Sequence, residues 1–212
     1  PTGRVMSKEE LLQIADLARE NPNINILSDE IYELILKKEF KHYSLSSLAN
    51  DLKDRIFIIN GFAKGWAMTG WRIGYLVGPK DVVKASSALQ SQSTSNVCSF
   101  VQKGALEALK INNEFFSMIN SHYDKRRSLV YEGLKNINGI YIEEPNGAFY
   151  AFPKLPNSSI TSVDFCNKAL QDYGLVVVPG KAFGADECIR ISCAASEIKI
   201  KDGLQRIEKA IS

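Results

Sequence analysis

Residues 60–75, which read NGFAKGWAMTGWRIGY, decide how the rest of the sequence is interpreted. Their lysine, Lys64, lies among small and aromatic residues. The preceding segment 55–59, RIFII, is typical of a buried strand, and a second apolar run follows at 73–77. Lys64 therefore lies where a strand ends, which is where α/β sheets place their ligands. Apolar surroundings lower the pKa of a lysine, and a neutral amine can form a Schiff base with a carbonyl compound.

Three further polar residues are candidates for the same site. Arg72 follows Lys64 across a glycine-containing turn, and it can supply a fixed cation for a phosphate. Asp29 follows a short predicted strand at 24–27, with Tyr32 about one helical turn further on. A carboxylate at the carboxyl end of a strand points into the ligand crevice. The alternative for Asp29 is a helix cap, and the alternative for Lys64 is a solvated lysine beside core aromatics.

Length and composition set the limits of these interpretations. The chain has 212 residues and a net charge of +2, which indicates neither nucleic acid nor an acidic partner. No apolar run reaches the roughly 20 residues of a membrane span, and we expect no signal peptide. We expect no metal site, because His42 and His122 are isolated in the sequence. The cysteines form no CxxC pair, so we expect buried thiols in the reducing cytoplasm: Cys98, Cys166, Cys188 and Cys193.

The apolar patterns predict two domains. Helices are expected at 7–21, 45–52, 81–92, 97–109, 112–136, 163–173 and 196–211, with strands at 24–27, 55–59, 73–77, 140–142, 148–152, 175–178 and 188–193. Ser7 and Glu10 form a capping box for the first helix. The apolar stripe changes within 112–136, where the charged run 124–127 is interpreted as a solvated face. The predicted domains are therefore 1–122 and 123–212.

Arg190 lies inside the otherwise apolar strand predicted at 188–193. A buried arginine needs a partner, and the usual partner is a carboxylate that it binds with two parallel hydrogen bonds. The alternative is an arginine on an edge strand that faces water. The sequence alone leaves both interpretations open.

Several stretches together resemble the class I/II aminotransferases, which are pyridoxal-phosphate-dependent enzymes of fold type I. The resemblance spans the whole chain and is strongest for the bacterial-type aspartate aminotransferases. It is carried by the segments PTG at 1–3, SDEIY at 28–32, NGFAKGWAMTGWRIGY at 60–75, PNGAFY at 145–150, PGKAFG at 179–184 and RIS at 190–192. The fold it implies is α/β, with a three-layer α/β/α large domain, here incomplete, and a small C-terminal α+β domain.

The resemblance implies roles for the candidate residues. Lys64 would hold pyridoxal 5′-phosphate through a Schiff base and would move the proton at the substrate α-carbon. Asp29 would pair with the pyridine nitrogen, Tyr32 would bind the phenolic oxygen, and Arg72 would bind the phosphate. In the small domain, Arg190 would bind the substrate α-carboxylate, with Phe149 as a wall of the site. The reaction implied transfers an amino group between an amino acid, aspartate or similar, and a 2-oxo acid such as 2-oxoglutarate.

The sequence also departs from the family pattern. Ala63 stands where many relatives carry serine, Gly61 where some carry a phosphate-binding serine, and Lys181 where serine is frequent. None of these changes removes a named catalytic group. The chain begins inside the family's Asn-Pro-Thr-Gly motif, so it resembles the C-terminal half alone. The glycine-rich phosphate loop and the aromatic ring that stacks on the cofactor are missing from it. We therefore expect a fragment or one piece of a noncovalent pair, with an uncovered sheet edge. We also expect negligible transamination by this chain alone and a homodimer in the full-length protein.

Two other functions are compatible with the same residues. A pyridoxal-phosphate enzyme with this constellation can instead be a C–S lyase that catalyses β-elimination, which releases ammonia and pyruvate rather than a new amino acid. A non-catalytic cofactor-sensing domain of a transcriptional regulator is the third candidate, with its DNA-binding module elsewhere. Analysis of the reaction products separates the two enzymes.

Overall fold

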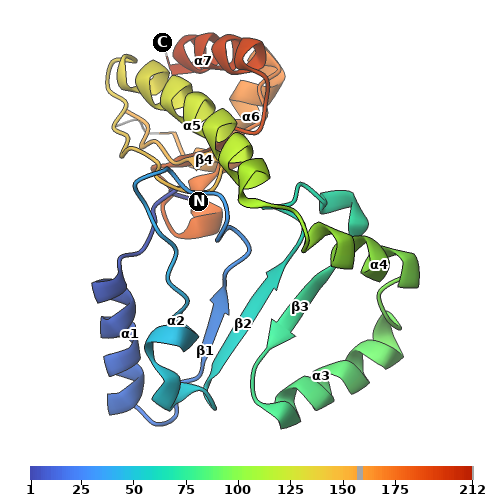
Figure 1. Cartoon of the computed structure of the whole chain (residues 1–212). Helices are drawn as coiled ribbons and strands as arrows, with labels where there is room; N and C mark the ends of the chain where they lie inside the picture. The colour runs from blue at the N-terminus through green and yellow to red at the C-terminus, as the bar shows by residue number, and fades with distance from the viewer. Residues whose placement is uncertain (157–159, 212) are drawn as a thin grey trace. The chain divides into compact units, whose positions relative to one another are not determined.

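The fold is known from a computed structural model that describes residues 1–156 and 160–211 (Figure 1). The chain forms two compact units. The lysine unit comprises Met6–Leu36 and Lys41–Phe116, and the arginine unit comprises Pro1–Val5, Lys37–Phe40 and Ser117–Ser212. Along the chain, the division between the units falls within helix α5 (Asn113–Lys135), the helix in which the sequence places its boundary. The assignment of 1–122 and 123–212 to a large and a small domain stays a prediction.

The lysine unit is built on a three-stranded sheet with the order β1-β2-β3. Its strands are β1 (Ile26–Asp29), β2 (Ile56–Gly61) and β3 (Gly74–Val77). Strands β1 and β2 run parallel, and β3 runs antiparallel to β2. The carboxyl ends of β1 and β2 therefore lie at the same edge of the sheet as the start of β3.

One face of this sheet packs against the helices that precede β1 and β2. These helices are α1 (Lys8–Glu20) and α2 (Leu45–Leu48), the latter followed by the 3-10 turn η1 (Asn50–Leu52). Their alanine and leucine side chains form a core with Ile26, Ile56 and Ile58 of the sheet. The capping box of α1 is confirmed, because the Ser7 hydroxyl accepts from the Glu10 amide and the Glu10 carboxylate accepts from the Ser7 amide.

The second half of the lysine unit is less well packed. It contains the 3-10 turn η2 (Thr69–Trp71), α3 (Lys80–Ser93) and α4 (Ser99–Ala108). Alanines of α4 form a small core with Phe62, Trp66 and Met68 from the lysine stretch. In contrast, no residue of α3 is buried.

The arginine unit has a second three-stranded sheet, with the order β4-β6-β5. The elements that follow α5 are β4 (Tyr150–Ala151), α6 (Ser162–Tyr173), β5 (Val178–Pro179), the 3-10 turn η3 (Gly180–Phe183), β6 (Ile189–Ser192) and α7 (Glu197–Ile211). Side chains of α5, α7, β4 and the loop after β6 form the main core, and α6 packs in a second one. The predicted strands at 140–142 and 148–152 are shorter than expected. Only β4 and a single bridge between Tyr141 and Lys154 remain there, because proline cannot donate to a ladder and Ala148 has a positive φ of 52°.

The expectation that 124–127 forms a solvated face is wrong for Arg127. Its exposed fraction is 2%. The guanidinium donates to the Asp124 carboxylate and to the Ala148 carbonyl, and the buried Nε has no hydrogen-bond partner within the described residues. Arg127 precedes the buried Val130 and Leu134 by three and seven residues, so it lies on the buried face of the helix. The run of charges in the sequence hides this periodicity.

The cysteine expectation needs one correction. All four cysteines are free, but Cys98, at the start of α4, is exposed, while the other three are buried. Burial raises the pKa of the Cys166 thiol to about 11 and that of the Cys193 thiol to about 12. None of the described helices combines the length and the apolar character that a membrane span requires.

Candidate functional site

The predicted cofactor-binding residues of the lysine unit all lie at or near the ends of its strands. Asp29 is the last residue of β1 and lies opposite Ile59 of the parallel strand β2. Its side chain is exposed, and its Oδ1 accepts a hydrogen bond of 3.2 Å from the Ile31 amide. The residues that follow form turns rather than a helix, so Asp29 is not a helix cap. The Asp29 carboxylate therefore lies at the end of the sheet where β1 and β2 finish.

The structure brings Lys64 and Tyr32 together. The Lys64 Nζ lies 5.8 Å from the centroid of the Tyr32 ring, and both side chains are half-buried. The turn that carries Lys64 packs directly on the turn after β1. A Cβ added to Gly65 would lie 2.8 Å from Leu34 Cδ1 and 2.9 Å from Leu34 Cβ. Only glycine allows this approach without displacing Leu34, so Gly65 sets the position of its neighbour Lys64.

The Lys64 turn is also fixed by its own hydrogen bonds. The Met68 amide donates to the Phe62 carbonyl over 3.2 Å, and the Thr69 hydroxyl donates to the Ala63 carbonyl over 2.8 Å. The indole of Trp66 reaches α4 and donates to the Ala108 carbonyl over 3.1 Å. The lysine is therefore presented by a braced loop rather than by a flexible one.

Arg72 lies immediately before β3, at the sheet edge where β2 ends. Its backbone is left-handed, with φ 54° and ψ 49°, which is uncommon for a residue other than glycine and is often found at functional sites. Its Nη1 donates to the Thr69 carbonyl over 3.0 Å, and the side chain is otherwise exposed. The hairpin that contains Arg72 is tight at its base, because a Cβ on Gly61 would lie 2.7 Å from the Cα of Gly74.

A buried polar network next to Asp29 was not predicted from the sequence. Glu30 is 6% exposed, and its carboxylate contacts His42 Nε2 at 3.1 Å and accepts from the hydroxyls of Ser44, at 2.9 Å, and Ser28, at 3.1 Å. The interpretation of His42 as isolated is therefore wrong. These contacts connect the 41–44 loop to Glu30, the residue that follows Asp29 at the end of β1. The sequence signal that points to this network is the position of Glu30, next to Asp29 at the end of a strand.

Asn60 extends this network at the end of β2. It is 4% exposed, its Nδ2 donates to Glu33 Oε1 over 2.7 Å, and its Oδ1 accepts from the Gly61 amide over 2.7 Å. Burial, followed by the charges of Glu33 and Glu30, raises the pKa of Tyr75 on the neighbouring strand. Ligand atoms of Glu30, Glu33 and His42 all lie within 4.8 Å of one another, a spacing compatible with a metal ion. Because each of them already has a hydrogen-bond partner in the protein, we interpret the group as structural.

In the arginine unit, Arg190 is held by aromatic rings. Its guanidinium carbon lies 4.4 Å from the centroid of the Tyr150 ring and 4.9 Å from that of Phe183. β6 is the middle strand of its sheet, with Arg190 opposite Val178, so the edge-strand alternative is wrong. The carboxylate partner is also not found: within residues 1–156 and 160–211, Arg190 makes no ion pair and no hydrogen bond. Its donors are available to an anion from outside the unit.

Phe149 lies next to these rings but belongs to the core. Its ring stacks on Tyr123 of α5, with centroids 5.4 Å apart and planes at 22°, and it packs against the main core of the arginine unit. Burial raises the pKa of Tyr123. The turn before Phe149 is anchored to the first residues of the chain, because the amides of Asn146 and Gly147 donate to the Gly3 carbonyl over 2.8 and 2.7 Å. The role of Phe149 as a wall of the substrate site stays a prediction.

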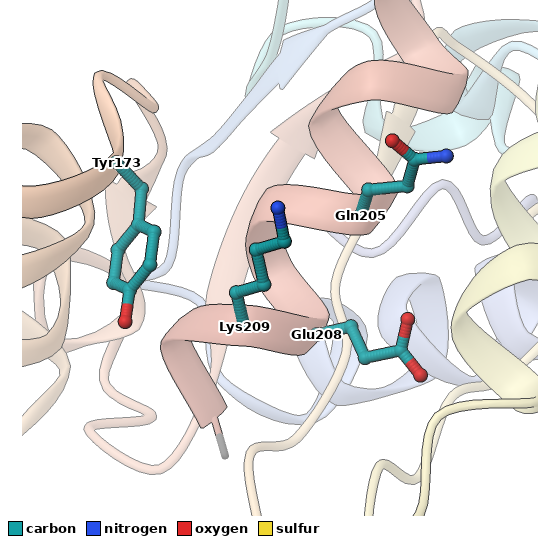
Figure 2. A pocket seen from close by; sticks show the side chains of 4 residues that line it. All are labelled: Tyr173, Gln205, Glu208 and Lys209. Carbon is teal, nitrogen blue, oxygen red and sulfur yellow. The ribbon is translucent and has the colours of Figure 1, made fainter.

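A surface pocket of the arginine unit is separate from these residues. Figure 2 shows its lining, which consists of Tyr173 at the end of α6 and Gln205, Glu208 and Lys209 of α7. The polar ends of Gln205 and Glu208 point away from Tyr173. None of the predicted site residues lines this pocket, and we assign no role to it.

Comparisons with known proteins agree on one protein family. The family model described as aminotransferase class I and II matches residues 1–207. A probable aspartate/prephenate aminotransferase of Rickettsia felis is 40% identical over 220 residues, which cover 99% of this chain and 54% of that protein. The aspartate aminotransferase of Pyrococcus horikoshii is 40% identical over 215 residues, covering 100% of this chain and 54% of the relative.

Solved structures agree with the sequence comparisons. The aspartate aminotransferase of Rhizobium meliloti matches with a TM-score of 0.92 at 36% identity, covering 100% of this chain and 55% of that one. An aromatic aminotransferase of Pyrococcus horikoshii also matches with a TM-score of 0.92, at 34% identity, covering 100% of this chain and 57% of that one. The chain thus spans about half the length of the relatives that it matches.

The close approach at Gly65 gives a testable prediction. Gly65→Ala places a methyl group within about 2.8 Å of Leu34 and should lower the free energy of unfolding by about 1–3 kcal/mol, as overpacking does. Gly70→Ala, in the same stretch, is the matched control, because a Cβ there meets nothing within 4 Å. Urea unfolding of the two variants measures the difference. Equal stabilities would mean that Gly65 does not set the turn.

Proposed function

Because this chain belongs to the class I and II aminotransferase family, we propose that it supplies the lysine, the ring-binding residues and the substrate-binding arginine of a pyridoxal-phosphate-dependent aminotransferase. The observation that carries the proposal is the gathering of an amine, a carboxylate, a phenol and a guanidinium at one edge of a sheet. These groups are Lys64, Asp29, Tyr32 and Arg72, and the parallel pairing of β1 with β2 explains why they gather there.

The residues of the lysine unit fit pyridoxal 5′-phosphate, which enzymes of this family use. The cofactor has an aldehyde, a ring nitrogen, a phenolic oxygen and a phosphate. Lys64 is an amine for the aldehyde, Asp29 a carboxylate for the protonated nitrogen, Tyr32 a hydroxyl for the phenolic oxygen, and Arg72 a guanidinium for the phosphate. When bound, the cofactor supplies an electron-accepting ring conjugated to the α-carbon of the substrate.

Each protein group then has a defined task. The Lys64 Nζ, once free, accepts the proton from the substrate α-carbon and returns it to the product. Asp29 keeps a proton on the ring nitrogen through its negative charge, which requires its carboxylate to stay ionised. Arg72 is already held by the Thr69 carbonyl, so it loses little conformational entropy when it binds an anion.

Arg190 is suited to bind the α-carboxylate of the amino acid. The rings of Tyr150 and Phe183 fix the guanidinium plane without occupying its N–H groups. A planar carboxylate can then accept two parallel hydrogen bonds, which fixes the orientation of the substrate. We propose aspartate, or an amino acid like it, as the amino donor and a 2-oxo acid such as 2-oxoglutarate as the acceptor. The names of the relatives support this choice.

The complete reaction belongs to a longer molecule. This chain spans about half of its relatives, so we propose that turnover takes place in a full-length homodimer in the cytoplasm and that residues 1–212 alone are nearly inactive. The groups needed for chemistry at the α-carbon and for carboxylate binding are in this half.

The covalent role of Lys64 can be tested by reductive labelling. Full-length protein incubated with pyridoxal 5′-phosphate and reduced with borohydride should carry the label on the peptide that contains Lys64. Lys64→Arg should remove it, because a guanidinium does not form the Schiff base. Lys84→Arg, on the exposed helix α3, should retain the label. Peptide mapping by mass spectrometry reads out the site, and a label on another lysine would refute the assignment.

The role of Arg190 can be tested by kinetics of the same protein. Arg190→Lys keeps the charge but loses the planar fork, so kcat/KM for aspartate should fall about 100-fold, equivalent to about 2.7 kcal/mol of transition-state binding. Arg206→Lys, a partly exposed arginine of the same unit, serves as the control and should change kcat/KM less than twofold. An amine substrate without the α-carboxylate should react equally with both variants. Loss of that reaction in Arg190→Lys would indicate general damage instead.

A further inference from the structure

The aromatic ring of Phe183 lies against Arg190 without belonging to a core. The guanidinium carbon of Arg190 is 4.9 Å from the centroid of this ring, and the ring meets that of Phe152 edge-on at 5.8 Å. Phe183 is nevertheless 38% exposed and is a member of neither core formed by the described residues of the arginine unit. A ring that is only partly covered gains little from burial. Its position over Arg190 therefore depends on the backbone that carries it.

That backbone is the turn η3, which begins the loop from Gly180 to Cys188. The Gly180 amide donates to the Cys188 carbonyl over 2.8 Å, and the Ala185 amide donates to the Gly180 carbonyl over 3.1 Å. A Cβ on Gly180 would lie 2.2 Å from the carbonyl oxygens of both Ala185 and Cys188, so only glycine fits there. These contacts close the base of the loop, and Phe183 lies three residues beyond Gly180.

A buried serine of helix α6 holds this loop on both sides of Phe183. Ser162 is the first residue of α6 and is fully buried. Its hydroxyl accepts from the Lys181 amide over 3.1 Å and donates to Asp186 Oδ1 over 2.5 Å. Its own amide donates to the same carboxylate oxygen over 3.0 Å and to the Asp186 carbonyl over 3.1 Å. Lys181 and Asp186 flank Phe183 in the sequence, so one residue fixes the backbone before and after the ring.

The bonds between Ser162 and Asp186 favour this loop conformation over others. The hydrogen bond from the Ser162 hydroxyl is the main reason why the pKa of the Asp186 carboxyl lies below its ordinary value. The carboxylate is therefore a charged acceptor, and hydrogen bonds to charged groups are the stronger ones. A loop conformation that moved Asp186 and Lys181 away would leave the buried Ser162 hydroxyl without these partners, which is unfavourable.

We propose that Ser162 and Asp186 are positioning residues for substrate binding, because they keep the ring of Phe183 against the guanidinium of Arg190. This role rests on the function proposed above for Arg190, which is to bind the α-carboxylate of the amino acid. A guanidinium that is already oriented by a ring loses less conformational freedom when it binds a carboxylate. Ser162 and Asp186 thus act on the substrate through Phe183 and Arg190, and not by touching it.

Steady-state kinetics of the full-length protein, loaded with pyridoxal 5′-phosphate, test this role. Asp186→Ala removes the carboxylate that Ser162 binds, at an exposed position where the fold tolerates the change. We expect KM for aspartate to rise about fivefold, as for the loss of one cation–π contact, with kcat changed less than about twofold. Reaction of an amine without an α-carboxylate should be unchanged. Ser162→Ala should give the same pattern, because it removes the other half of the same bond.

Glu187→Ala is the matched control. Glu187 is the next residue of the loop and is also exposed, and its carboxylate lies 4.0 Å from Lys154 Nζ in an exposed ion pair, which contributes little. It should change KM for aspartate less than about twofold. An equal rise in KM for Asp186→Ala and Glu187→Ala would overturn the proposed role. So would a slower reaction of the amine in Asp186→Ala, because that would indicate general damage to the unit.

A double variant tests whether Asp186 acts through the ring. Phe183→Leu alone should raise KM for aspartate about fivefold, because it takes the ring away from Arg190. Adding Asp186→Ala to Phe183→Leu should then leave KM unchanged, since the ring that Asp186 positions is gone. If the two effects multiply instead, Asp186 does not act through Phe183 and the proposed role is wrong.

The outcome is separable from that of the Arg190 experiment. If Arg190→Lys leaves kcat/KM for aspartate unchanged, the proposed function of Arg190 is rejected, and the roles of Ser162 and Asp186 are rejected with it. If Arg190→Lys lowers kcat/KM but Asp186→Ala leaves KM unchanged, Arg190 binds the carboxylate without help from this loop. Only the roles of Ser162 and Asp186 are then rejected.

Discussion

The close approach of the Lys64 turn to the turn after β1 is the constraint on which the site depends. Parallel pairing alone would bring the carboxyl ends of β1 and β2 side by side, since neighbouring strands lie about 4.8 Å apart. It would not fix where a side chain three residues beyond the strand points. That is determined by Gly65, whose missing side chain lets the backbone rest on Leu34, and by the hydrogen bonds that brace the turn. Lys64 and Tyr32 are neighbours because of this contact.

Two arginines of the arginine unit, Arg127 and Arg190, show how the same side chain is prepared for different tasks. Arg127 donates to the Asp124 carboxylate and to the Ala148 carbonyl, so its charge is already paired inside the unit. Arg190 is held instead by the faces of Tyr150 and Phe183. A cation over an aromatic ring gains roughly 0.5–2 kcal/mol, and its N–H groups stay available. A resident carboxylate would compete with the substrate, whereas the rings orient the guanidinium without that competition.

The outcome for individual residues shows what a sequence can reveal. The capping box at Ser7 and the placement of Lys64 at a strand end follow from local patterns, and the structure reproduces both. Arg127 was misjudged because its neighbours are charged and only the spacing to Val130 reveals the buried face. The contact of His42 with Glu30 and that of Arg190 with Tyr150 join segments that are separated in the sequence. Such contacts depend on tertiary packing, which periodicity and composition do not encode.

The position of β1 as an outer strand of its sheet affects the chemistry of the site. β1 ends at Asp29, so an outer strand of the described sheet carries the carboxylate that we propose for the ring nitrogen. In the present chain, water solvates that carboxylate and screens its charge. A cofactor ring bound beside Asp29 would remove part of this water and strengthen the attraction between Asp29 and the protonated ring nitrogen. Because the cofactor would bind the folded site and not the unfolded chain, its binding would in turn stabilise the lysine unit.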